Sequence, residues 1–302
     1  MKKTLKNLLL TLSLCSNAIW IGWAQEGTEQ AQDADGGVIP AVQRPVTSSV
    51  MFGVGGTTLH DTYLTNQLYD GTSLNLSLQR VRLMKHGRLE KDQWFDLSYA
   101  TTTQEVSDAN QMLAFRVRYS YAMHVFRDWE HSYQMRSHLF AGLCAMYNIG
   151  ANYNLSMGTG NNPANMHQTM NLGLSAGYQW DFSLRRRPGD VRLTVQTPLL
   201  GGAFSPEFAQ SYYTMYTYGD PLSDNYYFTS WHRQQDLDVR LTSDIPIRAI
   251  FPLMDRYNTA LRVGVNYHIE TQKINHLITR YSYCQVVLGW TWQHVPYKGK
   301  RL

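Results

Sequence analysis

The stretch 170–184 alternates apolar residues with small or polar ones from end to end. Side chains of a β-strand point to opposite faces in turn, so this stretch predicts a strand with one apolar and one polar face. Soluble strands ordinarily have about five or six residues, whereas tilted strands of about ten residues span the hydrocarbon of a membrane. The pattern therefore favours lipid on one face and a polar lumen on the other. The apolar positions are Met170, Leu172, Leu174, Ala176, Tyr178, Trp180, Phe182 and Leu184.

Further segments alternate in the same way, with differing clarity, and bring the expected number of strands to about ten. An even number of strands is typical of outer-membrane barrels. The sequence thus predicts an all-β protein, an antiparallel up-and-down transmembrane β-barrel, and an additional pair of strands within 201–235 would make twelve. With a periplasmic N-terminus, the three longest connections fall on the outer side, as such barrels require. The other segments are 47–58, 72–84, 93–103, 111–126, 132–150, 190–199, 236–245, 258–271 and 279–293.

The N-terminal residues 1–24 are typical of a secretory signal. Three lysines precede an apolar run, and Gly22-Trp23-Ala24 offers a small-x-small site for cleavage after Ala24. The polar segment 25–46 predicts a flexible periplasmic leader, with the barrel at 47–302. Beyond the signal, no apolar run reaches the length of about 18 residues that a membrane-spanning helix needs. Removing the three lysines lowers the formal net charge from +4 to +1, which gives no reason to expect a nucleic-acid partner.

Short motifs distributed over the mature chain carry a resemblance to a known family. The motifs are Leu59–Leu64, Leu68–Gly71, Gly160–Ala164, Thr197–Gly201, Phe204–Pro206, Gln210–Tyr213, Phe228–Ser230 and His232. With them, the chain resembles an uncharacterised, domain-of-unknown-function family of outer-membrane barrels of Bacteroidota. The resemblance implies a Gram-negative outer membrane and a barrel fold, and it implies no activity. One departure is the extension that follows Trp292, because such barrels commonly end in an aromatic residue on the last strand.

The polar motifs map to the outward loops or to the adjoining strand ends. Their convergence predicts either a surface binding site or a hydrogen-bonded lid that seals a narrow barrel, and the sequence leaves both open. The candidate loop residues are His60, Asp61, Asn161, Asn162, Tyr212 and Tyr213.

A second set of polar residues occupies the inward positions of the alternating strands. An arginine facing lipid at the membrane midplane costs about 2–4 kcal/mol, which fixes the inward orientation of these strands. The lumen of a barrel of about ten strands is narrow, so paired charges are expected to pack as a network rather than to line a channel. The expected lumen residues are Arg116, Arg118, Arg240, Arg262, His268 and Glu270.

No complete catalytic set can be read from the chain. Ser230 and His232 have the period-two spacing that would place a hydroxyl beside an imidazole on one strand face. The histidines form no spaced pair with supporting ligands, so we expect neither a metal nor a cofactor. We therefore expect a non-enzymatic outer-membrane protein whose partners are lipids and other outer-membrane proteins. The alternatives are a lipid-active hydrolase or acyl transferase, a small pore, and an accessory subunit of a larger complex.

Overall fold

The computed structural model describes most of the segment 46–294. The expected signal peptide, all but the last residue of the expected leader, and all but the first two residues of the C-terminal extension lie outside the described residues. The described ranges are 46–84, 89–104, 107–132, 135–156, 163–184, 187–207, 210–218, 222–247 and 259–294.

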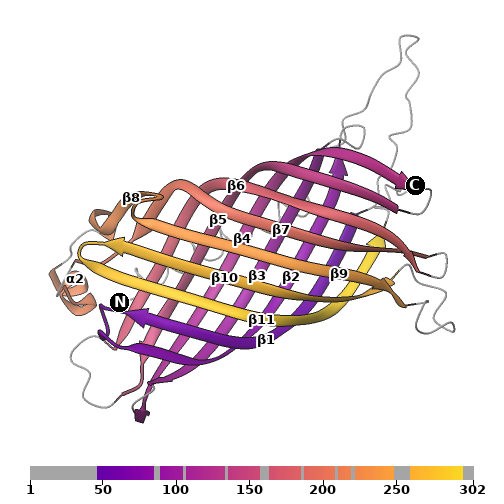
Figure 1. Cartoon of the computed structure of the whole chain (residues 1–302). Helices are drawn as coiled ribbons and strands as arrows, with labels where there is room; N and C mark the ends of the chain where they lie inside the picture. The colour runs from indigo at the N-terminus through magenta and orange to yellow at the C-terminus, as the bar shows by residue number, and fades with distance from the viewer. Residues whose placement is uncertain are drawn as a thin grey trace, which may run out of the picture. The chain divides into compact units, whose positions relative to one another are not determined.

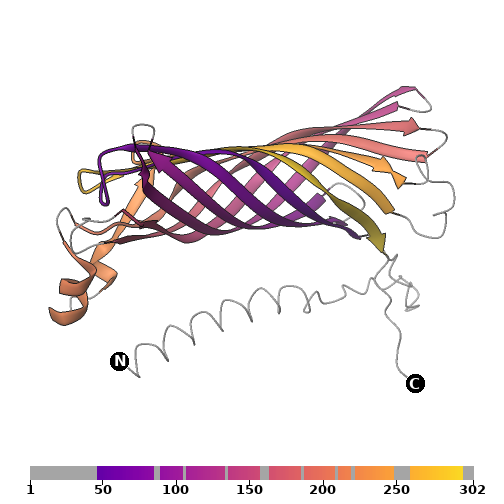
Figure 2. The same cartoon turned by 90° about the horizontal axis from the view of Figure 1, so that it is seen from below.

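The described residues form an antiparallel sheet of eleven strands, ten of which close into an all-β barrel. Consecutive strands are neighbours, and the pairing of the first strand with the last completes the ring (Figure 1, Figure 2). This confirms the predicted antiparallel barrel. The strands are β1 (Val46–Asp61), β2 (Leu68–Met84), β3 (Leu89–Gln104), β4 (Ser107–Ser132), β5 (Met135–Asn154), β6 (Ala164–Leu184), β7 (Arg187–Phe204), β8 (Tyr226–Ser230), β9 (Gln234–Pro246), β10 (Thr259–Ile274) and β11 (Leu277–His294).

The segment between β7 and β9 adds no pair of barrel strands, so the twelve-strand alternative is wrong. It contains α2 (Tyr212–Tyr218), the 3-10 helix η2 (Leu222–Asn225) and β8. β8 pairs only with the last five residues of β7, while β9 pairs with an earlier part of the same strand. β8 and β9 therefore lie one after the other along the same edge of β7, and the turn at 231–233 separates them. We call the barrel end that carries α2 and β8 the loop end, and the opposite end the turn end (Figure 1).

The barrel wall places apolar side chains outside and polar side chains inside. Phe52, Leu143, Met170 and Val286 are 64–68% exposed on the outer face, as the alternation of each strand requires. The inward positions between them carry arginine, aspartate, asparagine and serine, and these are buried. This arrangement is the reverse of a soluble protein, whose charged residues are almost never fully buried unless paired. Among the described residues, no helix is both long and apolar enough to cross a membrane.

Inside the barrel, apolar side chains fill a layer near the loop end. Leu59, Tyr69, Met112 and Tyr281 are each at most 2% exposed, and they pack in one cluster contributed by β1, β2, β4 and β11. The polar residues of the lumen lie on either side of this layer along the strands. The described part of the lumen is therefore filled by side chains, as expected for a barrel of this size.

Candidate functional site

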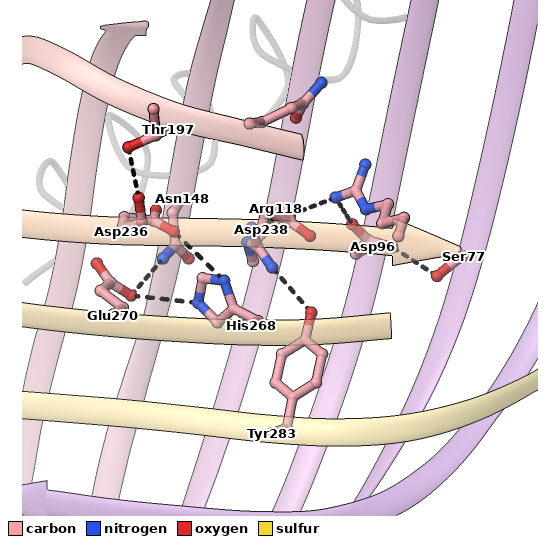
Figure 3. A network of polar contacts seen from close by, with 12 residues as sticks. Ser77, Asp96, Arg118, Asn148, Thr197, Asp236, Asp238, His268, Glu270 and Tyr283 are labelled. Carbon is pink, nitrogen blue, oxygen red and sulfur yellow. Dashed lines mark hydrogen bonds and ion pairs between the residues drawn. The ribbon is translucent and has the colours of Figure 1, made fainter. Parts of the chain in front are cut away.

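An ion pair crosses the middle of the lumen. Arg118 of β4 has its Nη2 2.5 Å from Oδ2 of Asp238 on β9, and its Nη1 donates to the Tyr283 hydroxyl at 2.8 Å (Figure 3). The three side chains are buried and come from strands that are not neighbours in the sheet. Each therefore reaches across the barrel rather than along its wall.

Arg240 connects this ion pair to a second carboxylate, on β3. Its Nη2 lies 2.6 Å from Asp238 and 2.9 Å from Asp96 of β3, so Asp238 is shared by two arginines. Ser77 donates to the other oxygen of Asp96 at 2.5 Å. The guanidinium also stacks over Trp94, with 4.2 Å between its central carbon and the ring centroid. Stacking and ion pairing together use the planar shape of arginine.

Two histidines and two carboxylates continue the network toward the loop end. His268 Nδ1 lies 3.4 Å from Asp236, and its Nε2 lies 3.9 Å from Glu270. Glu270 also contacts His167 Nε2 at 2.9 Å. It accepts a hydrogen bond from Asn148 Nδ2 at 3.3 Å (Figure 3). The four charged or ionisable side chains are buried, and β6, β9 and β10 supply them, while β5 supplies Asn148.

A second ionic cluster lies nearer the turn end, and sequence reasoning did not identify it as a unit. Glu90, Asp92 and His124 bring ligand atoms within 4.8 Å of one another, a spacing that could hold a metal ion. Arg192 of β7, however, forms a two-pronged contact with Glu90 and lies 3.2 Å from Asp92. A guanidinium thus already supplies the positive charge between these carboxylates, which disfavours a cation there.

The same cluster contains a serine, a histidine and a carboxylate that contact one another in the order of a hydrolytic triad. Ser175 Oγ lies 2.7 Å from His124 Nε2, and Nδ1 of that ring lies 3.2 Å from Glu90. Ser175 and His124 are 0% exposed and Glu90 is 3% exposed. A substrate could not reach this hydroxyl in the structure, so the contact serves to satisfy buried polar groups.

Arg262 joins β10 to the far side of the lumen. It contacts both oxygens of Asp244 at 2.6 Å in a fork, donates to Ser49 at 3.0 Å and reaches Gln79 of β2. The structure thus places all six residues that the sequence assigned to the lumen in buried positions. They are Arg116, Arg118, Arg240, Arg262, His268 and Glu270.

At the loop end, Asp61 organises a set of amide contacts. Its carboxylate accepts hydrogen bonds from Asn152 at 2.6 Å and from Asn165 at 2.9 Å, and also from the backbone N–H of Tyr63 at 3.1 Å. Arg116 donates to the Asn152 Oδ1 at 2.6 Å. Asp61 is 0% exposed, so it lies beneath the loops and not on the outer surface where the loop motifs were expected to gather.

Tyr212 of α2 covers this set from above. Its hydroxyl donates to Asn165 Oδ1 at 2.9 Å and accepts from the Met166 N–H at 2.7 Å. Tyr63 packs edge-on against it and donates to the Gln210 carbonyl at 2.8 Å. Burial raises the pKa of both phenols, and with the Asp61 charge nearby the pKa of Tyr63 reaches about 12. A small pocket beside this cover, lined by residues such as His167, Ser205 and Gln272, has room for about one water molecule.

Of the other expected loop residues, the two that the structure describes, His60 and Tyr213, are separate from this cover. His60 is the penultimate residue of β1, with its side chain on the outward face, and Tyr213 is 72% exposed. Asn161 and Asn162 lie outside the described residues. The six candidates therefore do not form one surface site in the described structure, because two of them point inward, two point outward and two are not described.

Ser230 and His232 meet at the start of the turn between β8 and β9. Ser230 Oγ lies 2.5 Å from His232 Nδ1, and both residues are accessible. No carboxylate or amide among the described residues contacts the other ring nitrogen, so the pair lacks the group that would orient the imidazole. The Arg233 N–H donates to the Ser230 carbonyl at 2.9 Å, which is the bond of a tight turn.

Comparison with known proteins settles the family. The model of the family described as "Protein of unknown function (DUF3316)" matches residues 8–301. The chain belongs to the DUF3316 family. No curated protein matches this DUF3316 chain in sequence.

Several solved barrels are similar to the DUF3316 chain in fold. The outer-membrane protease OmpT from Escherichia coli shares 7% identity, with 85% of this chain and 99% of OmpT covered and a TM-score of 0.44. The translocator domain of the autotransporter NalP from Neisseria meningitidis shares 8% identity over 93% and 97% of the two chains, with a TM-score of 0.34. An outer-membrane channel from Pseudomonas putida F1 shares 9% identity over 88% and 100%, with a TM-score of 0.32. These values transfer no activity to the DUF3316 chain.

Proposed function

We propose that this protein is an integral, non-enzymatic outer-membrane barrel whose lumen is sealed by its own side chains. The observation that supports this proposal most directly is that apolar side chains face outward and charged side chains face inward. Leu143 and Met170 are 68% and 64% exposed outside, while Arg116 and Asp238 are 0% and 1% exposed inside. Only apolar surroundings outside the wall make this distribution favourable, because exposed apolar area of this extent is costly in water.

The sealing part of the proposal rests on three layers within the described lumen. Ion pairs such as that of Arg118 with Asp238 cross the middle of the lumen. The apolar cluster that contains Leu59 and Tyr281 fills the next layer, and Tyr212 covers the loop end. Of the expected loop residues, the described His60 and Tyr213 point outward and are available for contacts outside the barrel. We infer that the protein belongs to a Gram-negative cell of the Bacteroidota. We also infer that the signal is removed after Ala24. A mass measurement of the mature chain tests the cleavage, because the chain should then start at Gln25.

Planar-bilayer recording tests the sealed barrel. The purified protein, inserted into a bilayer, is expected to show no stable open level. The same preparation should run as a compact, heat-modifiable band on a denaturing gel, which establishes that a folded barrel was present. A large, steady conductance from that folded material would contradict sealing and favour the small pore.

A second candidate function follows from the contact between Ser230 and His232. A lipid-active hydrolase or acyl transferase would use an exposed hydroxyl with a neighbouring imidazole near the membrane surface, and the 2.5 Å contact meets that first requirement. The test compares phospholipid hydrolysis by the wild type and by Ser230→Ala. We expect no hydrolysis above that of Ser230→Ala, and a clear loss in the variant would establish the enzyme.

A further inference from the structure

Four basic side chains lie together on the outer wall at the loop end. We call Arg233, Lys273, Arg280 and His60 the basic rim. The alternation of β10 and β11 places Lys273 and Arg280 on the outward face, in line with the exposed apolar residues of the same strands. Arg233, Lys273 and Arg280 are exposed, and His60 is half-buried.

The sheet register brings the four residues of the basic rim side by side. His60 lies directly opposite Arg280 in the β1–β11 pair. The Lys273 N–H donates to the Arg233 carbonyl at 2.7 Å, so these two residues are also cross-strand neighbours. Arg280 lies opposite Thr271 on β10, two positions from Lys273. Diagonal neighbours of this kind are about 7–8 Å apart, within reach of long side chains.

The basic rim carries charge that the described protein does not neutralise. Among the described residues, Lys273 and Arg280 form no ion pair, and the Arg233 side chain has one hydrogen bond, to the Phe228 carbonyl at 3.4 Å. Asp70 on β2 is the outward carboxylate on the neighbouring side, and it accepts a hydrogen bond from Thr58 at 2.7 Å. The lumen arginines are ion-paired or hydrogen-bonded inside the barrel, whereas the outward rim has no acidic partner within the described part of the chain.

The same wall is apolar toward the middle of the barrel. Below the basic rim, Leu237, Ile269, Val286 and Val54 are 36–64% exposed on β9, β10, β11 and β1. Four residues of strand, as from Arg280 to Cys284, correspond to about 13 Å along the strand and about 9 Å along the normal of a membrane crossed at about 45°. Polar headgroups occupy roughly 5–8 Å on each side of the hydrocarbon. Long basic side chains that extend toward the membrane therefore reach headgroup depth.

We propose that the basic rim binds the phosphorylated headgroup of an anionic lipid, whose acyl chains lie against the apolar wall below. This inference rests on the proposed membrane location of the barrel. Phosphate oxygens accept charge-assisted hydrogen bonds from arginine and lysine. The rim extends over three strand spacings, about 14 Å, which is wide enough for a headgroup with two phosphates. A phosphorylated glycolipid of the outer leaflet has both the charge and the acyl chains that this surface fits.

Native mass spectrometry of the detergent-solubilised barrel tests the proposal. The probes are a bisphosphorylated glycolipid (lipid A), its monophosphorylated form, phosphatidylcholine and inorganic phosphate. The variant Arg233→Gln/Lys273→Gln/Arg280→Gln removes three charges from the rim. The matched control Arg80→Gln/Arg82→Gln/Lys91→Gln removes three charges from the outward face near the turn end. A heat-modifiability gel establishes that each variant is folded.

The wild type is expected to retain lipid A in preference to phosphatidylcholine, and the monophosphorylated form should bind more weakly. Each basic residue near an anionic membrane strengthens binding about fivefold, so the rim variant, which lacks three of them, should bind lipid A about a hundredfold more weakly. The control should retain wild-type binding. Equal loss in rim variant and control, equal retention of phosphatidylcholine, or full competition by inorganic phosphate would each overturn the lipid site. Failure of the wild type to form a heat-modifiable barrel would instead contradict the proposed function.

Discussion

Arg118 and Asp238 face each other across the lumen, with 2.5 Å between Nη2 and Oδ2, although 120 positions separate them in the chain. Asp238 also holds Arg240 at 2.6 Å. One carboxylate therefore contacts two guanidinium groups at the centre of the barrel, and Asp96 supplies the second negative charge. Buried charges of this kind are tolerated only while each keeps its partner.

Replacing Asp238 by Asn is expected to destabilise the barrel strongly. The change leaves Arg118 without a carboxylate and Arg240 with Asp96 alone, and loss of one partner of a buried pair costs about 3–5 kcal/mol. Urea unfolding of the barrel in detergent measures the change. The control is Asp70→Asn, an exposed carboxylate, which should shift stability by less than about 0.5 kcal/mol. Equal stability of the two variants would contradict the ion-pair interpretation.

Two adjacent glycines of β1 should respond in opposite ways to the same substitution. A Cβ added at Gly55 would lie 1.9 Å from the Cys284 carbonyl oxygen, whereas a Cβ at Gly56 would meet nothing within 4 Å. Gly55→Ala must therefore separate β1 from β11, and overpacking of this kind costs about 1–3 kcal/mol. Gly56→Ala serves as the matched control and should keep wild-type stability. The midpoint of thermal loss of the compact gel band measures both, and similar midpoints would refute the close approach of the two strands.

Arginine scanning of β5 should report the position of the membrane. Leu143 is 68% exposed in the middle of the strand, and Leu155 is 45% exposed just beyond its loop end. Leu143→Arg should cost about 2–4 kcal/mol and Leu155→Arg about 0–1 kcal/mol, because the penalty for arginine falls from midplane to interface. Folding titrations into lipid vesicles give the two values. Equal penalties would show that Leu143 does not face hydrocarbon.

The loop-end cover should weaken in strong alkali. The pKa of Tyr63 is raised to about 12, first by burial and then by the Asp61 charge, whereas an unfolded tyrosine ionises near about 10. The neutral phenol thus stabilises the folded state fully below about pH 10, and this contribution is lost as the pH rises to about 12. The ultraviolet titration difference between the wild type and Tyr63→Phe reports the ionisation of Tyr63 and should have its midpoint near pH 12. A midpoint near that of free tyrosine would mean that Tyr63 is not buried.

The sequence predicted the wall of the barrel well because alternation is a local property. It underestimated strand length: β4 runs from Ser107 to Ser132, while alternation indicated 111–126. The missing residues lie beyond the apolar band, where both faces of a strand are polar and the period-two signal disappears. β8 was not predicted as a separate strand, because five residues are too few to show a clear period-two pattern. It pairs with only one strand, β7.

The interior contacts were less accessible to prediction than the wall. Alternation indicates which face a residue occupies, but it does not indicate which residue lies across the lumen. Glu90 fell in a segment expected to be a turn, so its contact with Arg192 was not foreseen. The Arg116 side chain meets Asn152 and not a carboxylate, a choice that depends on the tilt and register of the closed sheet.

The cross-lumen pairs also bear on how such a chain can enter a membrane. The partners Arg118 and Asp238 belong to strands from different halves of the chain, so a partly assembled sheet would present unpaired charge to hydrocarbon. Their neutralisation requires that both halves curl toward each other before the β1–β11 seam closes. We therefore expect insertion and closure to be one concerted event, with the charges meeting inside a nearly complete ring.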